Sequence, residues 1–155
     1  MKYTRLTKEQ FESLHEEFSR FLASQSITAD EWQQLKRNKP HVAEEELDVF
    51  SDLIWEATLS KVEYLENWSK SQVYLFSFKE RYIKLIAVKI NNNSIDLLTN
   101  EGIQWLEKNI GADEVEIYEG TKNYAQERKL DLFDYIKEGA IISEGGFYKT
   151  LKELL

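Results

Sequence analysis

The sequence contains no cysteine among its 155 residues. Disulfides, thiolate nucleophiles, zinc–thiolate sites and iron–sulfur clusters all need cysteine, so the composition excludes them. The absence of cysteine is compatible with a reducing cytoplasm, and the polar residues 1–10 do not form the pattern of a signal peptide. No apolar run approaches the about 20 residues that a membrane-spanning helix needs. We therefore expect a cytoplasmic protein that does not associate with a membrane.

Histidine is scarce, and the sequence holds only His15 and His41. Glu12 and His15 have the spacing found in carboxylate-bridged di-metal sites, but no second copy exists because Asn38 stands three residues before His41. A serine nucleophile would need a histidine base, and the Gly-x-Ser-x-Gly turn is absent. Glycine-rich phosphate loops are absent too. We therefore predict no catalytic, cofactor-binding or metal-binding residues, and the sequence leaves open whether the protein is an enzyme.

Basic side chains are outnumbered by acidic ones, 20 to 28, which gives a formal charge of −8. A negatively charged chain repels phosphate backbones, so we expect no nucleic-acid partner. The one dense basic cluster, at residues 36–39, is interpreted as the solvated end of a helix. Tyr74, Phe76 and Phe78 alternate along one strand face without interleaved basic residues, which is typical of a core and not of a base-stacking platform.

The length and the 42% apolar content indicate one packed domain over residues 1–155. Helices are predicted to start after Thr7 and Thr28, each of which is followed three residues later by Gln or Glu in a capping-box pattern. Pro40, the only proline, suits the first turn of a third helix, which we expect to run to about Trp68. The first helix is predicted to bury one apolar stripe, made of Phe11, Leu14, Phe18, Phe21 and Leu22.

The second half of the chain is rich in aromatic and β-branched residues and predicts strands. Residues 73–78 and 82–90 are expected to form an antiparallel hairpin, followed by a turn at 91–94 and a short strand over 95–98. Helices and strands then alternate, with helices over about 100–110, 123–137 and 147–155 and strands over 115–118 and 140–143. The spacing of the last two strands is typical of a right-handed crossover between parallel neighbours. The predicted fold class is α+β, a helical N-terminal half packed on a small mixed β-sheet with a C-terminal β-α-β-α segment.

The third helix carries more than one apolar surface. Its main apolar arc, predicted to face the core, consists of Leu47, Phe50, Leu53, Ile54 and Ala57. An acidic stripe, interpreted as a solvated face, consists of Glu45, Asp48, Asp52 and Glu56. Trp55, Leu59 and Val62 form a second apolar strip beyond that stripe. Either the first helix covers this strip within the chain, or a second copy or another protein binds it.

Two glycine-containing segments follow the predicted strands of the C-terminal half. Gly120, Thr121 and Lys122 come after one strand, and Ser143, Gly145 and Gly146 come after the next. If the two strands are parallel neighbours, both corners lie at one edge of the sheet, where backbone amides can bind a small anion. Glycine is also the ordinary residue of a tight turn, and acidic residues in both corners oppose an anion.

Four short segments carry a resemblance to a known family. They are SITADEW at residues 26–32, ELDVFSDLIWE at 46–56, KVEYLE at 61–66 and the Gly139–Ile142 tail. Together they resemble an uncharacterised protein family of Bacteroidetes over nearly the whole chain. The resemblance implies a bacterial cytosolic protein and carries over no functional residues.

The sequence favours a non-enzymatic interaction or scaffold protein, with self-association through the third helix as one form of it. The alternative comes from a different class, a protein or enzyme that binds a small anionic ligand at the corners near Gly120 and Gly146. The two hypotheses differ in a structural requirement, because the second needs the strands near Val115 and Ala140 to be parallel neighbours.

Overall fold

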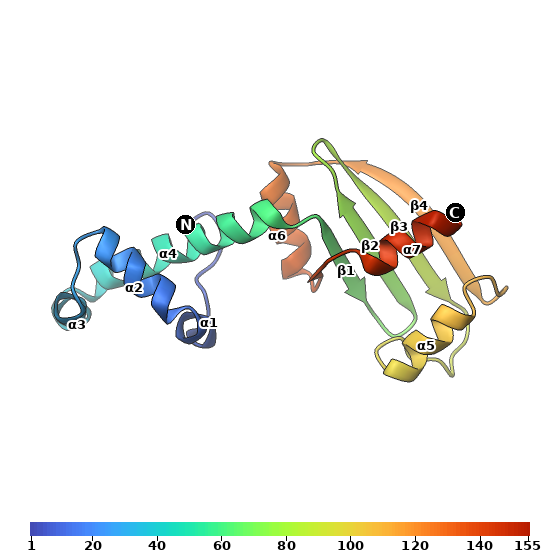
Figure 1. The fold of residues 1–155 in the computed structure, drawn as a ribbon, viewed down its shortest axis with the longest axis horizontal. Coiled ribbons are helices and arrows are strands. Elements are labelled where there is room, and N and C mark those ends of the chain that lie inside the picture. The colour runs from blue at the N-terminus through green and yellow to red at the C-terminus, as the bar shows by residue number, and fades with distance from the viewer. The chain divides into compact units, whose positions relative to one another are not determined.

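The computed structural model describes residues 1–155, and the chain divides into two compact units (Figure 1). The N-terminal unit comprises Met1–Ser60, and the C-terminal unit comprises Lys61–Leu155. The organisation of residues 1–155 as a single domain stays a prediction. None of the helices is both long enough and apolar enough to cross a bilayer.

The N-terminal unit is built from helices α1 (Lys8–Ser13), α2 (His15–Ser24), α3 (Ala29–Asn38) and α4, which begins at Pro40 as predicted. The capping box at Thr7 is confirmed, because its side chain accepts from the amide of Gln10 and the Gln10 side chain accepts from the amide of Thr7. Thr28 likewise accepts from the amide of Glu31. The predicted first helix is broken at Leu14, whose backbone leaves the helical region with φ −108° and ψ 22°.

Aromatic rings form the core of the N-terminal unit. The ring centroid of Phe18 lies 5.3 Å from that of Trp32 on α3 and 5.0 Å from that of Phe50 on α4. Phe11 and Phe21 complete the cluster on Phe50. The apolar stripe predicted for residues 11–22 therefore does face the core, and edge-to-face ring pairs add about 0.5–1.5 kcal/mol each beyond the area they bury.

Residues 62–68 and 95–98 also differ from the predicted secondary structure. Helix α4 ends at Lys61, and the residues expected to continue it form strand β1 (Tyr64–Trp68), because pairing with β2 buries Leu65 completely. The strand predicted over residues 95–98 is wrong as well, since this segment is a turn. The side chain of Asp96 accepts a hydrogen bond from the amide of Leu98. This local hydrogen bond takes the place of the one that the amide would make to a neighbouring strand.

The C-terminal unit contains a five-stranded sheet in the order β4-β3-β2-β1-β5. Strands β2 (Gln72–Phe78) and β3 (Tyr82–Ile90) form the predicted hairpin. Strands β4 (Val115–Asn123) and β5 (Ile141–Ser143) lie at opposite edges, and every neighbouring pair is antiparallel. The α+β class is confirmed, but the prediction of a mixed sheet is wrong because all pairs are antiparallel. The parallel crossover is wrong too, because three strands separate β4 from β5.

Helices cover both faces of this sheet (Figure 1). On one face, α5 (Asn100–Lys108) and α7 (Gly146–Leu154) pack on the inward residues of β2 and β3, with Leu106 and Leu151 buried against Leu75 and Ile86. On the other face lies α6 (Arg128–Lys137), which follows β4 and leads through Gly139 to β5. Tyr135 of α6 stacks on Phe76, with ring centroids 4.7 Å apart.

The strand face that carries the predicted aromatic stripe is therefore largely part of the core. Phe76 and Phe78 are buried, which confirms the interpretation made from their alternation. Tyr74, farther along the same face, is exposed and its hydroxyl donates to the side chain of Gln72.

Candidate functional site

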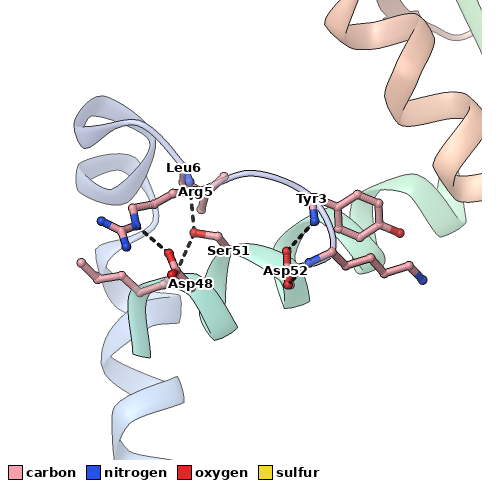
Figure 2. Close-up of polar contacts among 8 residues, drawn as sticks. Tyr3, Arg5, Leu6, Asp48, Ser51 and Asp52 are labelled. Carbon is pink, nitrogen blue, oxygen red and sulfur yellow. Dashed lines mark hydrogen bonds and ion pairs between the residues drawn. The ribbon is translucent and has the colours of Figure 1, made fainter. Parts of the chain in front are cut away.

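The acidic stripe of α4 is occupied by the chain's own N-terminal segment, residues 2–6 (Figure 2). The backbone amides of Lys2 and Tyr3 donate to the two carboxylate oxygens of Asp52, at 2.7 and 2.9 Å. Arg5 forms an ion pair with Asp48, with 2.6 Å between Nε and Oδ1. The expectation of a solvated face holds for Glu45, which is exposed, and is wrong for Asp48, Asp52 and Glu56. These three carboxylates bind backbone amides and cations of a segment about 50 residues earlier in sequence.

The contact between this segment and α4 includes a buried polar centre. Ser51 is 0% exposed, and its hydroxyl accepts from the amide of Leu6 at 3.0 Å while it donates to the carbonyl of Leu47 at 2.7 Å. The Tyr3 ring is buried with its centroid 6.4 Å from that of Trp55. Burial, with a hydrogen bond to Glu56 as the second cause, raises the pKa of Tyr3 to about 12.

The main apolar arc of α4 is rotated relative to the prediction. Phe50 is buried as expected, whereas Leu53 is 53% exposed and Ala57 is exposed too. The N-terminal segment covers the flank of α4 that carries Ser51 and Asp52, so the helix buries this polar flank in place of the side that carries Leu53. Hydrophobic spacing alone could not reveal that an extended segment covers polar residues.

The second apolar strip of α4 does not form an open surface. Leu59 and Val62 are 0% and 5% exposed, and Trp55 is half-buried beside Tyr3. Trp55 thus contacts the N-terminal segment. The sequence had indicated that the first helix would cover it. These exposures give no support to Trp55, Leu59 and Val62 as a docking surface for a second chain.

The six residues predicted to bind an anion are not brought together. Gly120, Thr121 and Lys122 lie within strand β4, paired with β3, so they do not form a strand-to-helix corner. Ser143 ends β5, and Gly145 and Gly146 begin α7 at the opposite edge of the sheet. The convergence on which the anion-binding hypothesis depended is absent.

Lys122 lies in an acidic environment. It lines a polar hollow of about 200 Å³ together with Asp131, Asp134 and Glu138, and its Nζ donates to the hydroxyl of Tyr135 at 3.3 Å. This hydrogen bond, with neighbouring carboxylates as further causes, raises the pKa of Lys122. The carboxylates that stabilise the ammonium group oppose a bound anion.

The corner at Gly145 is closed by the protein's own side chains. Gly145 has a φ of +83°, and a Cβ there would lie 2.5 Å from a ring carbon of Tyr64. Its amide donates to the hydroxyl of Ser143 at 2.9 Å, and that hydroxyl donates to Glu66. Glycine is required here for a left-handed backbone beside an aromatic ring, which is a structural role.

An apolar cleft of about 650 Å³ lies between α5 and α7 in the C-terminal unit. Its apolar lining comes from both helices and from the end of β1, and consists of Trp68, Ile103, Ile110, Phe147, Leu151 and Leu154. The indole of Trp68 stacks on the Phe147 ring, with centroids 5.8 Å apart and an interplanar angle of 15°. The volume falls in the range of about 300–1,000 Å³ typical of ligand sites.

The polar groups of this cleft are few. Glu107 contributes one carboxylate, and Thr150 contributes a hydroxyl that donates to the carbonyl of Gly146 at 3.0 Å. The cleft therefore combines an apolar floor with one negative charge at an exposed position, which suits binding through buried apolar area. Sequence reasoning missed this site, although Phe147, Leu151 and Leu154 repeat at helical spacing and could have indicated it.

The two histidines do not take part in a metal-binding cluster. His15 is exposed, and its Nδ1 lies 3.2 Å from the carbonyl oxygen of Glu12. No group of three or more His, Cys, Asp or Glu side chains is arranged to hold a metal ion.

The whole chain, residues 1–155, matches the family described as "Family of unknown function (DUF6495)", and the protein belongs to that family. This finding agrees with the resemblance to an uncharacterised family over the length of the chain. No curated protein and no solved structure matches the chain.

Proposed function

We propose that this protein is a non-enzymatic interaction protein that binds an apolar segment of another protein in the cleft between α5 and α7. The observation that carries the proposal is the lining of that cleft, six apolar side chains beside one carboxylate and one hydroxyl. The hydroxyl of Thr150 is already bonded to a backbone carbonyl. Such a lining offers buried area and orientation to a partner, and it offers no paired acid and base.

An amphipathic helix is the partner segment that fits this geometry. The cleft is bordered by two helices, and residues Phe147, Thr150, Leu151 and Leu154 lie on one face of α7. Helices dock in such grooves through apolar residues spaced three and four apart. A basic residue on the partner would meet Glu107, which orients the helix in the groove.

We propose a bacterial cytoplasm as the location of this function, and three properties support that proposal. The family resemblance points to an origin in Bacteroidetes, the chain lacks cysteine, and a net charge of −8 favours solubility. An interaction or scaffold role in that compartment is consistent with these properties. Binding of a small anion is not proposed as a second function, because Lys122 is surrounded by carboxylates and the two glycine segments lie at opposite edges of the sheet.

The proposal is tested by placing a photoreactive amino acid at the cleft in cells that produce the protein. Benzoylphenylalanine in place of Thr150, an exposed residue of the lining, should give a discrete covalent adduct with one partner on irradiation. The matched control carries the same group in place of Glu80, an exposed residue of the turn between β2 and β3.

A second substitution links the adduct to the apolar lining. Leu154→Glu changes an exposed residue at the rim of the cleft, so the fold should survive while the adduct at position 150 is lost. No adduct at position 150, or the same adduct at positions 150 and 80, would show that the cleft is not the docking site.

A further inference from the structure

Strand β4 is a long edge strand with a neighbour on one side only. It spans nine residues, contains no proline and pairs with β3 in an unbroken register from Val115↔Ile90 to Asn123↔Tyr82. Its side chains from Tyr118 to Asn123 are all exposed. Proline, bulges, covering segments and charged side chains are the devices that usually prevent an edge strand from pairing with another chain. Strand β4 has neither proline nor a bulge, and its charged residues are Glu116, Glu119 and Lys122.

The direction of the backbone groups in β4 follows from a single hydrogen bond. The amide of Asn91 donates to the carbonyl of Glu114 at 2.8 Å, so the backbone groups of Glu114 face β3. Backbone groups alternate along an antiparallel strand, so those of residues 116, 118, 120 and 122 also face β3. The amides and carbonyls of residues 117, 119, 121 and 123 and the carbonyl of Val115 therefore point away from the sheet, while the amide of Val115 donates to the carbonyl of Ala112.

We propose that a second copy of this chain pairs antiparallel with β4 across a two-fold axis at Glu119. The outward backbone groups of Glu119 then bond to those of the other Glu119, Ile117 bonds to Thr121, and the carbonyl of Val115 accepts from the amide of Asn123. The amide of Val115 already donates to the carbonyl of Ala112 at 3.1 Å, so the other four outward residues of each copy donate four hydrogen bonds, eight in all. Two five-stranded sheets become one continuous sheet of ten strands.

Side chains across this register are complementary in charge and shape. Glu116 faces Lys122 of the other copy, and the two-fold axis repeats this pair at the other end of the interface. Charges of opposite sign that face each other across strands are stabilising. Tyr118, 56% exposed, stands opposite Gly120, where a Cβ would have nothing within 4 Å. An aromatic ring packed over a cross-strand glycine is a known way to stabilise such a position.

The central pair of this register consists of two glutamates. Each Glu119 already accepts a hydrogen bond from Lys152 of α7, with 2.8 Å between the charged atoms. The two lysines therefore accompany the two carboxylates at the axis and offset their repulsion. Because β4 and the α5–α7 cleft share no residue, this inference stands or falls independently of the proposed function.

Sedimentation of the full chain over a range of concentrations up to the millimolar range tests for the dimer. We expect a species of twice 18.3 kDa. Glu116→Lys and Lys122→Glu each place like charges opposite each other at both ends of the interface, so each should weaken the dimer by about tenfold or more. The double variant Glu116→Lys with Lys122→Glu restores opposite charges and should restore the dimer.

The absence of cysteine allows a geometric test of the register. Residues that face each other in a hydrogen-bonded pair have Cα atoms about 5.5 Å apart, which suits a disulfide. Glu119→Cys should therefore form a covalent dimer under mild oxidation, whereas Ile117→Cys alone and Thr121→Cys alone should not. A chain that carries both Ile117→Cys and Thr121→Cys should crosslink again.

The outcomes separate this register from other associations. Recovery of the dimer in the charge-swapped double variant, together with the position-specific crosslink, supports pairing through β4. A monomer at every concentration overturns the proposal. A dimer whose stability does not change with the charge substitutions, or that crosslinks equally at positions 117, 119 and 121, overturns it too. Circular dichroism of each variant checks that the fold is intact.

Discussion

The backbone amide of Tyr3 donates a 2.9 Å hydrogen bond to Oδ1 of Asp52, a residue 49 positions later in the chain. The other carboxylate oxygen of Asp52 accepts from the amide of Lys2. One carboxylate thus satisfies two successive amides of a segment that belongs to no helix or strand. The acidic stripe of α4 fixes the course of the N-terminal segment through this contact and its neighbours (Figure 2).

Substitution of Asp52 should destabilise the N-terminal unit. Asp52→Ala removes the acceptor for two backbone amides, and we expect the free energy of unfolding to fall by about 1–2 kcal/mol. Urea denaturation measures the change. Glu45→Ala is the matched control, because Glu45 is an exposed carboxylate on the same helix, and it should change stability by less than about 0.5 kcal/mol. Equal effects of the two substitutions would contradict a specific role for Asp52.

The hydroxyl of Tyr3, which donates to Glu56, should make stability depend on pH in the alkaline range. The folded-state pKa is raised from 10.0 to about 12, so the folded chain retains a proton that the unfolded chain releases. This contribution to stability is fully present below about pH 10 and is lost as the pH rises through about 12. Tyr3→Phe should flatten the fall in unfolding free energy across this window.

The hydrogen bond from Tyr3 to Glu56 allows a control for the pH dependence. Glu56→Gln removes the negative charge that, after burial, is the next cause of the raised pKa. The tyrosinate absorbance of Tyr3, obtained as the difference between wild type and Tyr3→Phe, should then appear at lower pH than in the native protein. An unchanged titration in Glu56→Gln would show that burial alone sets the pKa.

The sequence predicted those elements whose signals are local. Capping residues such as Thr7 and Thr28, the first-turn Pro40 and the hairpin strands all follow from residues a few positions apart, and all are confirmed. Strand β1 was missed because it forms only by pairing with β2 and β5. Strand order is set by such long-range pairing, so spacing alone misplaced β4 and β5 as neighbours.

The candidate sites were harder to predict than the fold for a related reason. The stripe at Asp48, Asp52 and Glu56 looked solvated because a helical pattern does not show that residues 2–6 return to it. The cleft between α5 and α7 needs two helices on the same face of the sheet, and that arrangement depends on the antiparallel strand order. The sequence alone did not reveal residues that tertiary structure brings together and that show no regular spacing in the sequence.

Gly102 on α5 should not tolerate a side chain. A Cβ at this position would lie 1.8 Å from the carbonyl oxygen of Asp96, so Gly102→Ala must displace the helix from the preceding turn. We expect a loss of about 2–3 kcal/mol in unfolding free energy. Gly111→Ala is the matched control, because its Cβ would meet nothing within 4 Å, and it should stabilise the protein by about 0.4–1 kcal/mol. Thermal unfolding of both variants checks the contrast.

Arg128 at the start of α6 should hold the ends of two chain segments in the C-terminal unit. Its Nη2 donates to the carbonyl of Val62 at 2.6 Å and to that of Phe78 at 3.1 Å, which joins the entry of β1 to the end of β2. Lysine keeps the charge but loses the planar fork, so Arg128→Lys should cost about 1–3 kcal/mol. Amide hydrogen exchange should quicken at Phe78, whose amide donates to Glu63, while Arg81→Lys in the exposed β2–β3 turn leaves it unchanged. Unchanged exchange at Phe78 in Arg128→Lys would mean that strand pairing alone fixes this corner of the sheet.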